Sequence, residues 1–153
     1  MADNYLQKLA SVYRYILDNE ENSLVPLENE LAFVEDYYNM QKERGSDKIK
    51  LTVELYDKES FLVIPVSIQM LLENALKHNA ASKDSPLDIR IAINHESISV
   101  SNNIQRKQVM GQSTKTGLKN LSERVRLIMG KEMEISEKNN TFKVTIPLIS
   151  DHK

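Results

Sequence analysis

Residues 65–78 read PVSIQMLLENALKH, and this stretch carries the strongest structural signal in the chain. Pro65 is suited to the first turn of a helix, where a backbone N–H is not needed. Apolar residues then occupy almost every side of the helix that would follow, namely Val66, Ile68, Met70, Leu71, Leu72, Ala75 and Leu76. A helix that is apolar nearly all round is normally buried, so we expect this one inside the fold.

Alternating segments on both sides of this helix predict strands. Residues 48–55 alternate apolar and polar side chains, and so do residues 87–93 and 96–101. Such alternation is typical of a strand with one buried face. A short polar turn is expected between the first strand and the helix, and Asn94-His95 suits a tight hairpin between the other two strands.

The C-terminal part of the chain predicts a loop, a helix and a hairpin. Periodicity vanishes at residues 102–113, which we interpret as a mobile loop. Helical spacing returns at 118–130 and ends at a glycine. Residues 133–136 and 141–146 then predict a hairpin that turns at Asn139-Asn140.

Two amphipathic helices are expected before the first strand. Helical spacing predicts one over residues 3–18 and another from Pro26 to Gly45, and their broad apolar stripes indicate packing or dimerisation. The order of all these elements favours an α+β fold, a two-layer sandwich, over a doubly wound parallel sheet. With 153 residues, 41% of them hydrophobic, the chain suits one compact domain with an appendage.

Composition excludes several classes of function. The 20 Lys and Arg residues against 22 Asp and Glu leave a net charge of -2, so nucleic acid is not an expected partner. The absence of cysteine excludes disulfides and thiolate metal sites. The longest uncharged run, Ser60 to Leu72, is shorter than the ~20 residues that span a bilayer, so we expect a cytosolic chain without membrane contact.

Three polar residues lie on one stripe of the buried helix. Asn74, Lys77 and His78 are three and four positions apart, a spacing that brings them to the same side. In one interpretation, Asn74 supplies an oxygen ligand to Mg²⁺ and Lys77 supplies a positive charge to phosphate. In the other, Asn74 is a satisfied residue near the helix end, while Lys77 and His78 reach solvent. The spacing fits both interpretations.

A second polar region brackets the predicted loop. Asn102 and Asn103 end a strand, and Lys115-Thr116-Gly117-Leu118 opens a helix. Backbone amides at a helix N-terminus can receive an anionic phosphate, and a glycine there lets a ligand approach closely. Alternatively, Thr114 or Thr116 is an ordinary N-cap and Gly117 has no special role.

Taken jointly, these motifs resemble the LytS-type sensor histidine kinases in both order and separation. The matching segments are Ile64-Pro65, 71–78, 100–103, 116–121 with Glu123-Arg124, and, upstream, 13–15, 27–31, Tyr37-Tyr38, Gln41-Lys42 and Arg44. The resemblance implies the Bergerat-type ATP-binding fold shared by gyrase, heat-shock chaperone ATPases, histidine kinases and MutL. In that fold, helices cover one face of a mixed sheet, and the nucleotide is held between helices and a lid loop, which here would be residues 102–113. The expected ligands are ATP and Mg²⁺.

The resemblance also implies roles for individual residues. Asn74 matches the family's Mg²⁺-binding asparagine, and Lys77 with His78 matches its phosphate and ribose contacts. Asn102 stands where the family usually has the aspartate that accepts a hydrogen bond from the adenine amino group. Asn103 follows as in the family. Asn74 and Lys77 are therefore the expected catalytic residues.

The glycine boxes of the family are thinned in this sequence. Ile104 and Lys115 stand where glycines are usual, whereas Thr116, Gly117 and Leu118 follow the second glycine box. These departures predict weaker nucleotide binding, although Lys115 could add a cation near the phosphates. The alternative to a kinase is therefore a degenerate, non-catalytic interaction module with this fold.

The phosphoacceptor of the family is a histidine in an upstream motif resembling Pro-His-Phe-x-Phe-Asn, and this sequence contains no such string. His78 lies inside the nucleotide motif, while His95 and His152 are expected in a turn and a tail. We therefore expect residues 1–45 to be the remnant of the dimerisation and phosphoacceptor region and 46–153 to be the catalytic domain. The implied whole is a dimeric, membrane-anchored bacterial sensor that phosphorylates a response regulator.

A third reading is an ATPase or a serine-directed kinase on the same fold. In the ATP-hydrolysing relatives an acid occupies the position one turn before the magnesium-binding asparagine, and here that position is Met70. Phosphoryl transfer to an imidazole needs no such acid, so the histidine kinase interpretation is favoured.

Overall fold

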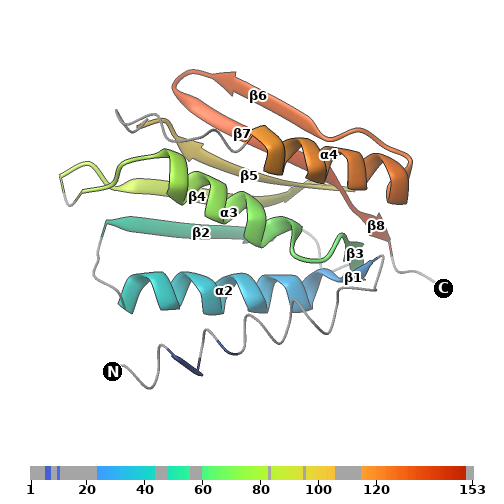
Figure 1. Cartoon of the computed structure of the whole chain (residues 1–153), viewed down its shortest axis with the longest axis horizontal. Coiled ribbons are helices and arrows are strands. Elements are labelled where there is room, and N and C mark those ends of the chain that lie inside the picture. The colour runs from blue at the N-terminus through green and yellow to red at the C-terminus, as the bar shows by residue number, and fades with distance from the viewer. Residues whose placement is uncertain are drawn as a thin grey trace.

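The computed structural model describes residues 24–43, 48–55, 60–82, 84–94, 96–105 and 115–150, together with residues 6, 7 and 10. Its elements, in chain order, are β1 (Val25–Pro26), α2 (Leu27–Glu43), β2 (Ile49–Leu55), β3 (Phe61–Val63), α3 (Ser67–His78), β4 (Leu87–Asn94), β5 (Ser97–Asn103), α4 (Lys115–Met129), β6 (Glu134–Lys138), β7 (Thr141–Pro147) and β8 (Ile149–Ser150) (Figure 1). Residues 6, 7 and 10 are helical, and the rest of the helix expected at 3–18 lies outside the described residues.

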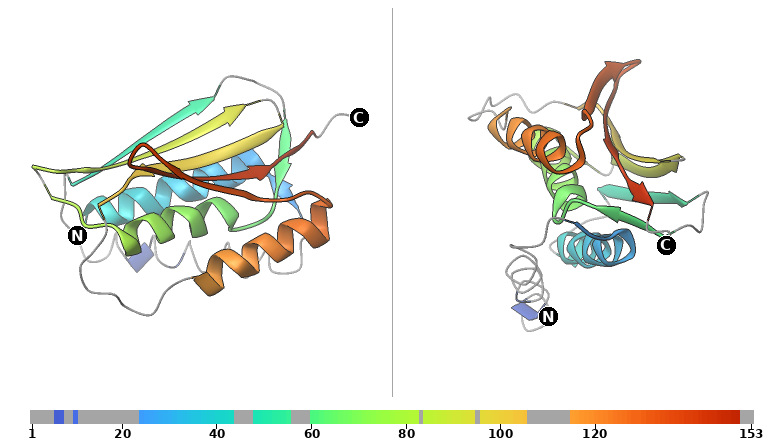
Figure 2. Two further views of the ribbon diagram at one scale, coloured as in Figure 1. Left: turned by 90° about the horizontal axis from the view of Figure 1, so that it is seen from above. Right: turned by 90° about the vertical axis from the view of Figure 1, so that its right-hand side faces the viewer.

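A five-stranded mixed sheet forms one layer of the fold. Its order is β2-β4-β5-β7-β6, with β2 parallel to β4 and the other neighbours antiparallel. Helices α3 and α4 lie over one face of this sheet, and α2 lies beside α3 (Figure 2). The predicted α+β sandwich, with a mixed sheet covered on one face by helices, is confirmed.

Alternation along the strands produces the single buried face. In β4 the side chains of Leu87, Ile89, Ile91 and Ile93 are buried, while the residues between them are exposed or half-buried. In β5 the inward row is Ile98, Val100 and Asn102. These rows pack against α3 and α4 because side chains on alternate strand residues share one face. Leu72 and Leu121, from the two helices, are fully buried in the same core.

Helix α2 belongs to this core as well. Val34, Tyr37 and Met40 are buried in the same apolar cluster as the sheet and α3. The Tyr38 hydroxyl donates a hydrogen bond of 3.0 Å to the carbonyl oxygen of Ile49, the first residue of β2. The helix predicted from Pro26 to Gly45 is therefore confirmed over Leu27–Glu43, with Pro26 in β1, and its apolar stripe packs inside the domain.

A second, small sheet was not anticipated. Strand β3 pairs with β1 and β8 in an antiparallel three-stranded sheet, where we expected only a polar turn before the buried helix. The expectation was wrong at Phe61–Val63 because three residues are too few to show alternation. Their partners, Val25–Pro26 and Ile149–Ser150, are distant in sequence and equally short.

Both predicted turns near the C-terminus are confirmed. Asn139 and Asn140 have φ of 52° and 61°, which is the left-handed pair that a two-residue hairpin requires. Gly130 follows α4 with φ of 67° and donates its N–H to the Arg126 carbonyl at 3.0 Å. In the part of the chain that the structure describes, no helix combines the length and apolar character needed to cross a bilayer.

Candidate functional site

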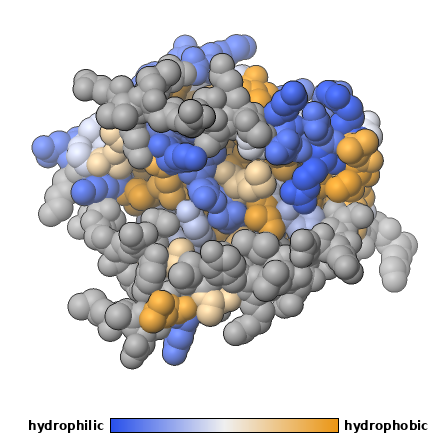
Figure 3. All heavy atoms as spheres, viewed as in Figure 1, coloured by the Kyte–Doolittle hydropathy of each residue, from blue (hydrophilic) through white to orange (hydrophobic). Residues whose placement is uncertain are grey.

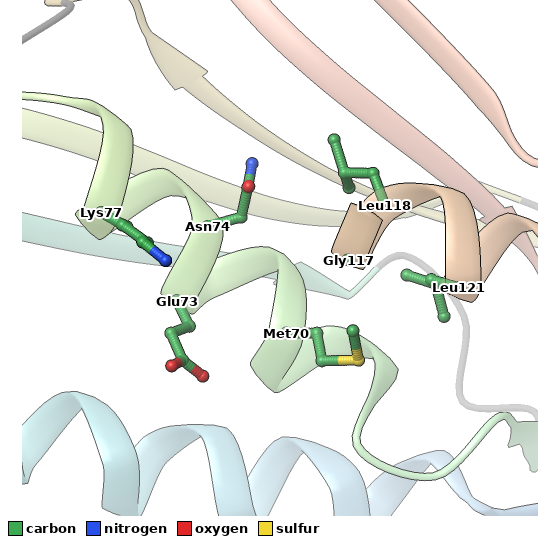
Figure 4. Close-up of a pocket in the computed structure, with 7 residues that line it drawn as sticks. All are labelled: Met70, Glu73, Asn74, Lys77, Gly117, Leu118 and Leu121. Carbon is green, nitrogen blue, oxygen red and sulfur yellow. The ribbon is translucent and has the colours of Figure 1, made fainter. Parts of the chain in front are cut away.

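A pocket of about 170 Å³ lies between α3 and α4 (Figure 4). It is lined by Met70, Glu73, Asn74 and Lys77 from α3 and by Gly117, Leu118 and Leu121 from α4. Figure 3 shows hydrophilic and hydrophobic residues interleaved on the helical side of the molecule.

Helical spacing explains why these side chains meet. Met70, Asn74 and Lys77 are separated by four and three residues, so they form one row on α3. Ile68, Leu72 and Ala75 occupy another side of the helix and are buried in the core. In Figure 4 the Asn74 amide is directed toward the α4 side of the pocket, whereas the Glu73 carboxylate is directed away from it.

Glu73 was not singled out from the sequence, although it lines the same pocket. Its Oε2 accepts a hydrogen bond of 2.8 Å from Nε2 of Gln69, one turn earlier on α3. Gln69 is buried and Glu73 is exposed, so the pair links the core side of the helix to the pocket rim. The signal available in the sequence was the i,i+4 spacing of an amide and an acid.

The N-terminus of α4 supplies the opposite wall. Gly117 and Leu118 line the pocket, and Lys115 and Thr116 lie in the first turn of the same helix, with side chains outside the described residues. A Cβ built on Gly117 would meet nothing within 4 Å, so the space in front of this residue is open. The predicted close approach of a ligand is therefore sterically available.

Asn102 occupies an inward position at the end of β5. It is 4% exposed and continues the row of Ile98 and Val100 on the helix-covered face. Its Nδ2 donates to the Asn103 carbonyl at 2.8 Å, and the side chain can accept a hydrogen bond only through Oδ1. This is the group that the expected adenine contact requires.

Asn103 has a different environment. Its Oδ1 accepts the N–H of Asp88 at 2.8 Å, and its Nδ2 donates to the carbonyl of Pro86 at 3.2 Å. Both polar ends of the side chain therefore join β5 to the start of β4. Within the described part of the chain, the wall of the pocket does not include His78, Asn102 or Asn103.

The predicted mobile loop begins later than the sequence suggested. Asn102 and Asn103 pair with Phe142 and Thr141 of β7, and the N–H of Ile104 donates to the Asn140 carbonyl at 2.9 Å. Asn102 and Asn103 thus belong to the sheet, Ile104 and Gln105 are hydrogen-bonded beyond its end, and the expectation of a loop starting at 102 was wrong. The expectation failed because Asn102, Asn103 and Gln105 are polar and show no apolar alternation, although their backbone is hydrogen-bonded. Residues 106–113 lie outside the described residues.

No three His, Cys, Asp or Glu side chains gather into a metal site among the residues the structure describes. A magnesium ion could still be held here in the way it usually is in nucleotide sites, by one protein oxygen together with phosphate oxygens and water. Asn74 provides such an oxygen beside the Lys77 cation. The donor set therefore fits Mg²⁺ only together with a phosphate ligand.

Solved structures that share the fold of this chain include segments of histidine kinases. The cytoplasmic segment of histidine kinase QseC matches with a TM-score of 0.60 and 18% identity, covering 95% of this chain and 90% of that one. The catalytic domain of histidine kinase ThkA matches with a TM-score of 0.55 and 14% identity, covering 81% of this chain and 97% of that one.

Sequence comparisons give the particular relatives. The sensor protein LytS of Streptococcus agalactiae serotype V is 28% identical over 155 residues, covering 89% of this chain and 27% of that protein. The sensor protein kinase HptS of Staphylococcus aureus strain USA300 is 30% identical over 101 residues, covering 65% of this chain and 19% of that protein. A family model described as "Histidine kinase" matches residues 1–49. The resemblance to LytS-type sensor histidine kinases is thus confirmed.

Proposed function

We propose that this chain is the catalytic and ATP-binding part of a two-component sensor histidine kinase. The observation that carries the proposal is the pocket between α3 and α4, in which Asn74 and Lys77 face Gly117 and Leu118. The chain spans 27% and 19% of the length of the LytS and HptS relatives, so the remainder of such a kinase would lie outside this sequence.

The pocket suits the phosphate end of a nucleotide. Its volume of about 170 Å³ is below the roughly 300 Å³ of a site that encloses a small organic molecule, so it would hold only part of ATP. Lys77 brings a cation, and the first turn of α4 brings backbone amides that favour anions. The Oδ1 atom of Asn102, on the inward face of β5, is the candidate acceptor for the adenine amino group.

The chemistry follows from these positions. Bound Mg²⁺ would neutralise charge on the phosphate oxygens, and Asn74 would hold it. Lys77 would stabilise the negative charge that develops as the γ-phosphoryl group is transferred, and α4 would keep the phosphate chain in line with the acceptor. An imidazole nitrogen of the acceptor histidine would attack the γ-phosphoryl group, and this attack requires no acidic side chain at position 70. The apolar Met70 in the pocket wall agrees with such a reaction.

The remaining parts of the system follow as proposals. The acceptor would be a histidine outside this sequence, in a dimer, and the phosphoryl group would pass to a response regulator. Residues 1–45 would be the remnant of the dimerisation and phosphoacceptor region, 46–153 the catalytic domain, and the whole a membrane-anchored sensor with this part in the cytoplasm. Helix α2, which lies in the first segment, packs in the core of the second.

A non-catalytic interaction module is the second candidate, favoured by Ile104 and Lys115 in place of usual glycines and by the small pocket. Isothermal titration with ATP, with and without Mg²⁺, separates the two candidates. The kinase proposal expects saturable binding that strengthens with Mg²⁺. No heat of binding at millimolar ATP would favour the interaction module.

A further inference from the structure

Glu30 of α2 is a fully buried carboxylate, with 0% of its surface exposed. Its Oε2 accepts the backbone N–H of Val66 at 3.1 Å, and its Oε1 accepts the N–H of Ile68 at 3.1 Å. Glutamate is almost never fully buried unless it is paired or hydrogen-bonded. Both carboxylate oxygens are therefore used to bind the beginning of α3.

The beginning of α3 needs this partner. Val66 is the N-cap residue, but its hydrocarbon side chain cannot accept the first amides of the helix. Its φ of 66° is in the left-handed region, which is strained for a β-branched residue and persists only where the surroundings impose it. The carboxylate from α2 supplies the missing cap and a favourable charge for the helix dipole.

Helix α4 reaches the same junction through Arg124. The guanidinium of Arg124 donates from Nη2 to the carbonyl of Pro65 at 3.3 Å, one residue before Val66. Partial burial lowers the pKa of Arg124, and the nearby Glu30 charge opposes that shift. A carboxylate from α2 and a cation from α4 thus enclose the residues at which α3 begins.

The junction lies on the two helices that form the pocket. On α3, Met70 and Asn74 follow Ile68 by two and six residues, and on α4, Leu121 and Gly117 precede Arg124 by three and seven. These four pocket residues are therefore within about two helical turns of the junction. A shift of the α3 N-terminus relative to Arg124 would change the width of the pocket.

We propose that Glu30 and Arg124 are positioning residues that hold α3 and α4 at the separation needed for nucleotide, so that the placement of α2 sets nucleotide affinity. The inference rests on the proposed function, because its readout is ATP binding. In this proposal, α2 is mechanically connected to the pocket although it lies outside the catalytic segment. Neither Glu30 nor Arg124 touches the ligand.

The test compares Glu30→Gln with Glu28→Gln, a matched control on an exposed position in the first turn of the same helix. The glutamine side chain keeps the shape of Glu30 but loses the negative charge and one hydrogen-bond acceptor. The free energy of a hydrogen bond to a charged group corresponds to a change of about tenfold or more in affinity. We expect the Kd for Mg-ATP to rise about tenfold in Glu30→Gln and to stay within twofold in Glu28→Gln.

Three further variants separate positioning from general destabilisation. Arg124→Gln should weaken binding, Arg124→Lys should weaken it less, and Glu30→Gln with Arg124→Gln should cost less than the sum of the single changes because both act on one junction. Arg124 is only partly buried, so its variants remain testable if Glu30→Gln does not fold. Val144→Ala opens a cavity in the core on β7 and serves as the stability control.

The possible outcomes are distinct. A parent chain that binds no Mg-ATP contradicts the proposed function itself. If the parent binds, unchanged affinity in folded Glu30→Gln and Arg124→Gln overturns the positioning role. A loss of affinity in Val144→Ala as large as in Glu30→Gln, at an equal drop in melting temperature, also overturns it. A loss of Mg-ATP affinity in the Glu30 and Arg124 variants, without a comparable loss in Val144→Ala, supports the positioning role.

Discussion

The side chain of Asn79 joins the end of α3 to the segment that follows β5. Its Oδ1 accepts the N–H of Gln105 at 2.8 Å, and its Nδ2 donates to the Ala75 carbonyl at 2.9 Å. Gln105 returns a hydrogen bond, because its carbonyl accepts the N–H of Ala80 at 2.7 Å. The chain therefore leaves β5 from a point that is fixed to the helix bearing Asn74 and Lys77.

This connection predicts where protection from amide exchange begins. The amides of Ile104 and Gln105 are hydrogen-bonded in the folded chain, so they should exchange slowly even without nucleotide. Added protection on binding Mg-AMP-PNP should be confined to residues 106–113. Hydrogen-exchange mass spectrometry with and without the nucleotide checks this. Equal protection of residues 106–113 with and without the nucleotide would contradict a lid there. The variant Asn79→Ala should remove the protection that the Gln105 amide has without nucleotide.

Substitution of Gly117 should separate folding from ligand binding. A Cβ at this position meets no protein atom within 4 Å, so Gly117→Ala should stabilise α4 by up to about 1 kcal/mol while it obstructs the phosphate approach. We expect a higher melting temperature together with a weaker affinity for Mg-ATP. Unchanged affinity would show that no ligand approaches this residue.

Gly130 is the matched glycine at the other end of α4. Its surroundings are equally open, but its φ of 67° is costly for a residue with a Cβ. Gly130→Ala should therefore destabilise the fold by about 1–2 kcal/mol without changing nucleotide affinity. Chemical denaturation and calorimetry on the same sample measure both quantities, and a stabilised variant would refute the left-handed cap.

Leu72 tests the core that supports the pocket. The side chain is fully buried on a different side of α3 from Asn74. Leu72→Ala should therefore lower the free energy of unfolding by about 2–5 kcal/mol, because it leaves a cavity. Urea unfolding gives the value. The exposed Leu127→Ala is the control and should change stability by less than about 0.5 kcal/mol. Similar values for the two variants would argue against the core position of Leu72.

The chain should bind ATP without becoming phosphorylated. Of its three histidines, His78 lies on the helix that lines the pocket, and the sequence places His95 and His152 in a turn and a tail. None is part of an acceptor motif, and phosphoryl transfer requires an acceptor aligned with the γ-phosphate. Incubation with radiolabelled ATP should leave this chain unlabelled, whereas a longer chain that includes the motif should be labelled. Stoichiometric acid-labile phosphate on the 153 residues would contradict this.

Local sequence patterns predicted most of the fold. Alternation identified the strands of the large sheet, and Asn139-Asn140 identified a hairpin because both residues tolerate a left-handed backbone. The same patterns could not reveal the small sheet, whose strands of two and three residues are defined only by partners far along the chain. Alternation also failed at Asn102 and Asn103, where polar residues continue a strand.

The candidate site was predictable where it depends on helix spacing. Asn74, Lys77, Gly117 and Leu118 line one pocket, as the stripe on α3 and the opening of α4 suggested. The contacts that hold this site together were not predictable, because they join distant residues. Glu30 binds Val66 across 36 positions, and Asn79 binds Gln105 across 26, with no periodicity that relates either pair.

The most direct test of the account is the affinity of Asn74→Ala for Mg-ATP, measured by isothermal titration beside the parent chain and Asn94→Ala, an exposed asparagine at the end of β4. Asn74 is half-buried in the pocket wall rather than in the core, so the variant should remain folded. We predict that Asn74→Ala loses Mg²⁺-dependent binding while Asn94→Ala keeps the parent affinity. A folded Asn74→Ala chain that binds Mg-ATP as tightly as the parent would contradict the assignment of this pocket.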